Sequence, residues 1–195
     1  MTIYKVMSGR KRIATAAPDD LFKVDEDAVK LEQAAAKSFH NITAKAIYVT
    51  KRARPDISLA IAFLTTRVKG PDIDDWRKLR HLIEYLRATR ELPLILGGDG
   101  TGVLSWYVDA SFAVHPDMRG HTGGAMTMGR GFPLDKSTKH KLNTRSSMES
   151  EIVAVDDLIP QILWARLFMK AQGFKVRDNI LYQDNRSAIL LEMNG

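Results

Sequence analysis

The chain has 195 residues, of which 45% are hydrophobic and none is cysteine, and its formal net charge is +6. This composition supplies a normal core, which excludes a disordered chain, and the lack of cysteine excludes disulfides, thiolate metal sites and cysteine nucleophiles. No apolar run approaches the roughly 20 residues of a membrane span, and the N-terminus lacks the apolar core of a signal peptide. The absence of cysteine suits a reducing, intracellular setting.

The sequence of the N-terminal half predicts an irregular leader followed by a helical segment. Residues 1–28 show no sustained periodicity and are predicted to be irregular. Apolar residues at helical spacing then predict three helices, the second of them apolar nearly all round and therefore buried. A short strand candidate and a glycine-rich linker at residues 97–100 follow, and we place the domain boundary at this linker. The three helices and the strand are expected at Val29–Val49, Ile57–Val68, Trp76–Arg90 and Pro93–Leu96.

Positive charge is prominent on the third of these helices and after the linker. Between Phe112 and Ser147 six basic residues stand against two acidic ones. Such a distribution fits a polyanionic partner, and ordinary solvation of surface side chains is the alternative. The basic residues of the third helix are Arg77, Lys78, Arg80, Arg87 and Arg90.

After the linker the hydrophobic period changes to that of strands. Residues Val103–Asp109 alternate between two faces, as in a half-buried strand. Arg119-Gly120-His121 is a predicted turn, and strands are expected over Gly124–Met128 and Leu134–Leu142 with glycines between them. A long helix, a strand at residues 180–184 and a helix at residues 187–193 complete the pattern. Three strands, helix, strand and helix predict an α+β fold with a mixed sheet.

The long helix has clear signals at both ends. Ser146 and Glu149 fit a capping box at its start, and Gly173 is well placed after its end near Gln172. Pro160 is expected to kink the helix or divide it in two. The predicted buried stripe consists of Ile152, Val155, Ile159, Ile162, Leu163 and Leu167.

Three carboxylates occupy the edges of these apolar elements. Asp109 and Asp184 close predicted strands, and Glu151 opens the long helix. If the two strands are parallel neighbours joined by a right-handed crossover, all three acids meet at one sheet edge. Like charges gathered there require cations, and two Mg²⁺ ions ~4 Å apart would hold a scissile phosphate. The alternative is three independent acids, one of them favoured by the helix dipole.

The motifs around these acids resemble a known family. They are Tyr107-Val-Asp-Ala-Ser, Arg119-Gly-His-Thr-Gly-Gly-Ala, Ser146-Ser-Met-Glu-Ser-Glu-Ile-Val-Ala-Val, Ile162-Leu-Trp and Tyr182-Gln-Asp-Asn-Arg-Ser-Ala-Ile. In this order they resemble the ribonuclease H domain of copia-type (Pseudoviridae) retrotransposon Pol polyproteins. Arg52-Ala-Arg-Pro-Asp-Ile, Trp76 and Leu82-Ile-Glu-Tyr-Leu-Arg-Ala-Thr are similar to the connection segment that precedes it. The resemblance covers roughly Val29 to Gly195.

The resemblance implies a ribonuclease-H-like fold, with residues 29–99 as a helical connection segment and residues 100–195 as the nuclease domain. It implies cleavage of the RNA strand of RNA–DNA hybrids with two Mg²⁺ (or Mn²⁺) ions, with Asp109, Glu151 and Asp184 as catalytic metal ligands. Glu151 is preferred over Glu149 because the family's helix acid directly precedes the apolar run. Ser111, Ser147 and Asn185 are candidate substrate-binding residues, since a protein recognises RNA by its 2′-hydroxyls.

The resemblance also implies partners and a location. The expected partners are the hybrid and the reverse transcriptase palm domain of the parent polyprotein, without a membrane, in the cytoplasm (in virus-like particles) or the nucleus. Two departures from the family matter. Nothing resembles the polymerase Tyr-x-Asp-Asp turn, and the sequence stops before the family's later His-containing stretch and final helix. We therefore expect weak or absent turnover, and a catalytically inactive hybrid-binding or structural module is the alternative function.

Overall fold

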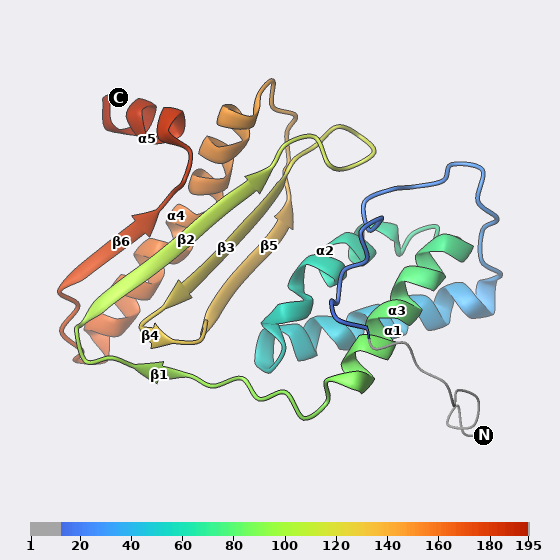
Figure 1. Cartoon of the computed structure of the whole chain (residues 1–195), viewed down its shortest axis with the longest axis horizontal. Helices are drawn as coiled ribbons and strands as arrows, with labels where there is room; N and C mark the ends of the chain where they lie inside the picture. The colour runs from blue at the N-terminus through green and yellow to red at the C-terminus, as the bar shows by residue number, and fades with distance from the viewer. Residues whose placement is uncertain (1–12, 195) are drawn as a thin grey trace.

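The computed structural model describes residues 13–194, which form a helical part followed by a sheet part (Figure 1). In Figure 1 the helices of the first half lie to one side, and the four-stranded sheet of the second half lies beside them with one long helix behind it. The predicted fold class, a mixed sheet with flanking helices after a small helical segment, is confirmed. None of the helices in residues 13–194 combines the length and hydropathy that crossing a membrane requires.

The three predicted helices of the first half are present with shifted ends. The second is buried as predicted, since Ile61, Phe63 and Leu64 are almost inaccessible to solvent. Asp72 caps the third by accepting hydrogen bonds from the backbone N–H groups of Asp74 and Asp75 in a capping box. The elements are α1 (Gln33–Arg52), a 3₁₀ turn η2 (Pro55–Ile57), α2 (Ser58–Arg67) and α3 (Ile73–Ala88).

The described part of the predicted leader, residues 13–28, contains no helix or strand. It is nevertheless part of the core of the helical half. Leu21 is 2% exposed, and Phe22 packs against the same cluster as Phe39 and Phe63. Burial of these side chains is worth ~1.5–3 kcal/mol each, so the segment contributes to stability. Residues 1–12 of the predicted leader lie outside the described residues.

Part of the predicted basic face of α3 is ion-paired with acidic residues of the protein itself. Lys78 is buried, and its ammonium group is ion-paired with Asp74 and donates to the backbone carbonyl of Lys23. Arg77 pairs with Asp74 and Asp20. At these two positions the structural role is favoured over contact with a phosphate backbone.

The second half folds into a four-stranded sheet of order β5-β3-β2-β6. Its antiparallel meander and its parallel β2–β6 pair, with Tyr107 opposite Tyr182, are the arrangement that the topology argument predicts. The crossover between β2 and β6 contains the long helix. The elements are β2 (Val103–Ser111), β3 (His121–Thr127), β5 (Leu134–Lys139), α4 (Ser147–Ala171), β6 (Asp178–Tyr182) and α5 (Arg186–Asn194).

Several predicted boundaries are wrong. The expected strand Pro93–Leu96 has no ladder partner, and the strand forms instead in the predicted linker, where β1 (Gly97–Gly98) pairs with β4 (Gly129–Arg130). Glycine allows the two backbones to approach closely at this pair. A Cβ on Gly129 would lie 2.8 Å from the Asp99 nitrogen. His121, placed in a predicted turn, begins β3.

The long helix α4 is continuous through Pro160, so of the two predicted alternatives the division is wrong, and the kink stays a prediction. Gly173 does follow its end with a positive φ of 86°, as a terminating glycine should. The face that packs on the sheet agrees with the prediction only at Val155 and Ile162. It consists of Ala154, Val155, Leu158, Ile162 and Ala165, whose two alanines let the helix approach the strands.

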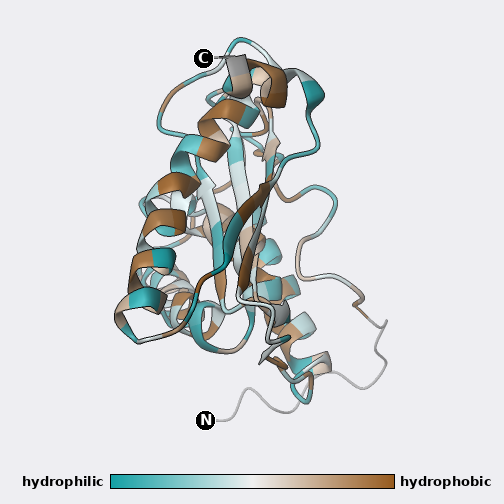
Figure 2. Ribbon diagram, turned by 90° about the vertical axis from the view of Figure 1, so that its left-hand side faces the viewer, coloured by the Kyte–Doolittle hydropathy of each residue, from teal (hydrophilic) through white to brown (hydrophobic). Residues whose placement is uncertain are grey.

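Ile159, Leu163 and Leu167, assigned to the buried stripe from their spacing, are 43–66% exposed. The helix is apolar on more than one face, and helical spacing alone does not say which face the sheet covers. Hydrophobic bands recur along α4 and α5 in Figure 2.

The two halves are joined by a buried aromatic and histidine contact. The ring of His115 packs against two phenylalanines that also contact each other, with centroid distances of 5.0 Å to Phe22 and 6.2 Å to Phe63. His115 Nε2 is 3.1 Å from His121 Nδ1, and His121 Nε2 is 2.8 Å from Ser137 Oγ. Both histidines are at most 3% exposed. The helical half therefore packs against the start of β3 and is held there by buried rings.

A candidate metal centre at the edge of the sheet

Asp109 is supplied by β2, the strand shared by the antiparallel and parallel parts of the sheet. Leu104, Trp106 and Val108 point into the core beneath α4, and the alternation of the strand turns Tyr107 and Asp109 to the other face. Asp109 is exposed and faces Gly123 across the ladder with β3. The sequence placed Asp109 at the end of its strand, and the structure extends β2 to Ser111.

Asp184 lies in the short turn between β6 and α5. The strand ends at Tyr182, so Asp184 is two residues beyond it and not on its face as predicted. Asn185 then caps α5, because its side-chain oxygen accepts hydrogen bonds from the backbone N–H groups of Ser187 and Ala188. The strand end and the helix cap fix this turn from both sides.

Glu151 comes from the first turns of α4. Ser146 caps this helix by accepting from the Glu149 N–H at 3.2 Å. The Glu149 carboxylate accepts from the backbone N–H of Arg145 at 2.7 Å, one residue before the position that a capping box uses. The Glu149 side chain thus caps the helix start, as expected. Glu151 is the buried acid, with 5% of its surface exposed.

The three predicted acids meet. One carboxylate oxygen from each of Asp109, Glu151 and Asp184 lies within 4.8 Å of the others. Burial raises the pKa of the Glu151 carboxyl, and the negative charges of Asp109 and Asp184 act in the same direction. Hydrogen bonds from Gln183 and the backbone of Ala110 oppose this increase in the pKa. The arrangement concentrates negative charge on hard oxygen ligands, which Mg²⁺ and Mn²⁺ prefer.

A cavity of about 520 Å³ opens beside Asp109, between the sheet face and the start of α2. Ser111, Ala125 and Phe132 line it from the sheet half, and Leu59 lines it from the helical half. Of the predicted substrate-binding residues, Ser111 therefore faces a cavity next to the acids. Ser147 is exposed at the first position of α4. The oxygen of Asn185 is engaged in the α5 cap, which leaves its amide nitrogen for a ligand.

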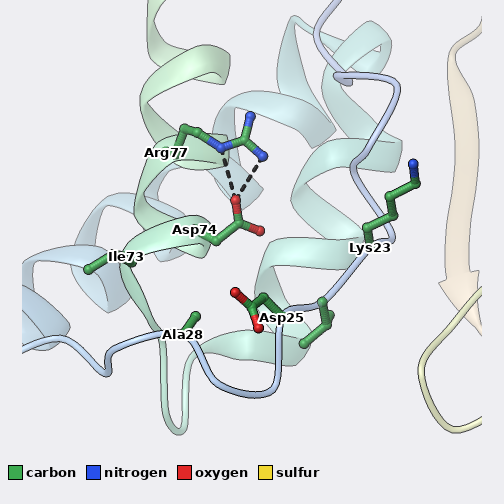
Figure 3. A pocket seen from close by; sticks show the side chains of 7 residues that line it. Lys23, Asp25, Ala28, Ile73, Asp74 and Arg77 are labelled. Carbon is green, nitrogen blue, oxygen red and sulfur yellow. Dashed lines mark hydrogen bonds and ion pairs between the residues drawn. The ribbon is translucent and has the colours of Figure 1, made fainter.

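A second cavity, of about 440 Å³, lies in the helical half (Figure 3). Two of its charged side chains, Arg77 and Asp74, form an ion pair with each other. Within residues 13–194, no cluster of carboxylate ligands like that at the sheet edge lines it. The lining residues are Lys23, Val24, Asp25, Ala28, Ile73, Asp74 and Arg77.

Two features of the site region were not predicted from the sequence. Gln183 is part of the motif that contains Asp184, yet its contact with Glu151 required the position of α4. The histidines of the sequence are dispersed without metal-ligand spacing, which favours surface positions, yet the structure buries His115 and His121. Their six-residue spacing across a loop carries no periodic signal, so only the packing of the helical half reveals them.

Comparison with known proteins yields matches to retrotransposon polyproteins. The chain is 28% identical over 150 residues to the retrovirus-related Pol polyprotein from transposon TNT 1-94 of Nicotiana tabacum, covering 76% of this chain and 11% of that protein. It is 29% identical over 143 residues to the corresponding polyprotein from transposon RE2 of Arabidopsis thaliana, covering 72% and 10%. The chain thus spans about a tenth of the polyproteins that it matches.

A further match is the secreted RxLR effector protein 161 of Plasmopara viticola, 27% identical over 119 residues that cover 60% of this chain and 84% of that protein. No protein-family model matches the chain, and no solved structure gives a significant match. The polyprotein matches support an origin of this chain in a retrotransposon Pol polyprotein.

Proposed function

We propose that this chain carries a ribonuclease H site that hydrolyses the RNA strand of RNA–DNA hybrids during reverse transcription. The observation that carries the proposal is the meeting of Asp109, Glu151 and Asp184 from three separate elements, with carboxylate oxygens within 4.8 Å. The sequence motifs support the same activity, and the polyprotein matches support an origin in a Pol polyprotein. Within the parent polyprotein, the reverse transcriptase palm domain is the proposed neighbour.

The residues present fit two divalent cations. Three carboxylates are an all-oxygen donor set, and two of them are exposed to an approaching substrate while Glu151 is buried. Bound Mg²⁺ or Mn²⁺ would supply an activated water and stabilise charge on the leaving oxygen. Asp109, Glu151 and Asp184 would hold the ions, and their rigid elements reduce the cost of ordering the ligands.

The chain's own residues would orient the hybrid. Ser111 lies two residues beyond Asp109 in β2, where its hydroxyl can donate to a phosphate oxygen or accept from a 2′-hydroxyl. Ser147, four residues before Glu151 at the start of α4, and the amide nitrogen of Asn185, the residue after Asp184, are the other proposed contacts. Selection of RNA over DNA would then depend on hydroxyl contacts next to the cleaved bond.

The proposal is tested by cation binding and cleavage in matched variants. The purified chain is titrated with Mn²⁺ by calorimetry and incubated with RNA–DNA hybrid, duplex RNA and duplex DNA. We expect measurable Mn²⁺ binding and, where cleavage occurs, cuts only in the RNA of the hybrid. Glu151→Gln should lose binding and cleavage by orders of magnitude. Glu149→Gln is the control, because it removes the same charge from the same helix outside the cluster.

The outcomes separate the candidate functions. Equal Mn²⁺ affinity in the wild-type chain and Glu151→Gln would contradict the assigned site. Binding of Mn²⁺ and hybrid without any cleavage would identify the chain as the inactive hybrid-binding module. Cleavage that Asp109→Asn leaves undiminished would exclude Asp109 from the reaction.

A further inference from the structure

Gln183 connects the buried acid to the turn that carries Asp184. Its side-chain nitrogen donates to Glu151 Oε2 at 3.0 Å. Its side-chain oxygen accepts from the backbone N–H of Asn185 at 3.0 Å. The amide thus joins α4 to the β6–α5 turn, between two of the three candidate metal ligands.

We propose that Gln183 is a positioning residue that fixes the Glu151 carboxylate for cation binding, an inference that rests on the proposed function. The amide oxygen of Gln183 accepts from the Asn185 N–H, and its nitrogen, which can only donate, faces Glu151. It acts on the cation site through Glu151.

The direction of the amide follows from its two partners. A carboxylate only accepts hydrogen bonds and a backbone N–H only donates. With the amide reversed, its oxygen would face the Glu151 oxygen and its NH₂ group would face the Asn185 N–H. Both contacts would then be repulsive, so the donor toward Glu151 is determined by the network.

Glu151 needs such a contact more than the other two acids do. Glu151 extends from α4 and its side chain has one more rotatable bond than that of an aspartate. Its carboxylate is therefore held less firmly by the backbone than that of Asp109 in β2. It is also buried, so an unpaired carboxylate oxygen would be costly there. A hydrogen bond to Oε2 offsets this cost and holds the carboxylate in one orientation. Partners behind a metal ligand typically change metal affinity 10–100-fold.

The test uses the full chain and Mn²⁺ alone as the probe. Gln183→Met keeps the length of the side chain and removes both hydrogen bonds, and Gln183→Ala is a second variant. Calorimetry at a temperature where all proteins are folded should give Mn²⁺ affinity roughly 10–100-fold below wild type. The electron paramagnetic resonance spectrum of bound Mn²⁺ should also change, because the position of one ligand changes. Gln172→Met, the same substitution at the end of α4, should bind Mn²⁺ like wild type.

A purely structural role predicts a different pattern. Gln183→Met would then lower the metal-free unfolding midpoint and leave the Mn²⁺ affinity and spectrum unchanged, which would overturn the inference. This failure differs from that of the proposed function: if the wild-type chain itself binds no Mn²⁺, the metal centre is wrong and the positioning role falls with it.

Discussion

Tyr107 and Tyr182 stack across β2 and β6, with ring centroids 5.0 Å apart and ring planes inclined by 15°. They are also register partners in the parallel pair. This pairing brings Asp109 and Asp184, two residues further along, to the same end of adjacent strands. A slip of one residue would turn one set of side chains to the opposite face. The acidic cluster therefore depends on the register that the tyrosine pair marks.

The first prediction concerns charge repulsion in the cluster. Asp184→Asn removes one of three negative charges whose oxygens lie within 4.8 Å. Without divalent cations, we expect the unfolding midpoint of this variant to equal or exceed that of wild type. With Mg²⁺ at 100 times its Kd, wild type should gain about 2.7 kcal/mol of stability, and the variant should gain little. Thermal unfolding with EDTA and with Mg²⁺ measures both, and an equal Mg²⁺ gain in the two proteins would contradict the prediction.

The second prediction concerns acid. Burial is the largest cause that lowers the pKa of His115 and His121 to about 4. Below the ordinary histidine value of 6.5, the unfolded chain therefore binds more protons than the folded chain. The stability that the two neutral buried rings contribute is fully present above about pH 6.5 and is lost as the pH falls from there through 4. The expected loss in the free energy of unfolding is on the order of 2 kcal/mol per histidine. Urea unfolding from pH 7.5 to 4 measures this slope.

The matched variants for this effect are His121→Gln and His81→Gln. The first removes a buried titrating ring, and should reduce the loss of stability between pH 6.5 and 4 although it lowers stability at pH 7.5. The second removes a half-buried ring that bonds to the carbonyl of Thr15 outside the buried pair, and it is the control. A wild-type slope in His121→Gln would refute the assignment.

The third prediction concerns the contact between α4 and β3. A Cβ at Gly124 would lie 2.6 Å from both terminal carbons of Leu158, which is fully buried. Gly124→Ala should therefore cost ~1–3 kcal/mol by overpacking, and Leu158→Ala ~2–5 kcal/mol by leaving a cavity. In the double variant the new methyl group occupies part of that cavity. The combined loss in urea unfolding should be smaller than the sum, and strict additivity would show that the two residues do not share this space.

The fourth prediction concerns the helical half. Residues 1–99 carry 18 basic and 13 acidic residues, a net charge of +5. Removing them should weaken hybrid binding and make its salt dependence shallower, because phosphate contacts are lost. Filter binding at several salt concentrations measures the slope. An unchanged slope would show that the helical half faces away from the nucleic acid.

Before interpreting that slope, the folding of residues 100–195 has to be checked. Their separation from the helical half exposes His115, which Phe22 and Phe63 cover in the whole chain. Circular dichroism and unfolding of the fragment provide the control.

The sequence by itself determined the type of most elements and the three acids. Several of these signals are local and can be recognised from the sequence alone. They are the alternation in Val103–Asp109, the cap at Ser146 and the glycine at 173. The acids could be named because each stands at the edge of an apolar run within a recognisable motif. Their roles as cation ligands stay a prediction.

Only the tertiary structure decided which surfaces meet. The buried face of α4, the pairing of Gly97–Gly98 with Gly129–Arg130 and the burial of His115 depend on contacts between segments far apart in sequence. The contact between Gln183 and Glu151 is of the same kind, joining residues 32 positions apart. A helix that is apolar on several faces satisfies its own hydrophobic pattern in more than one orientation. The sheet that packs against it selects one orientation, because only close packing distinguishes an alanine face from a leucine face.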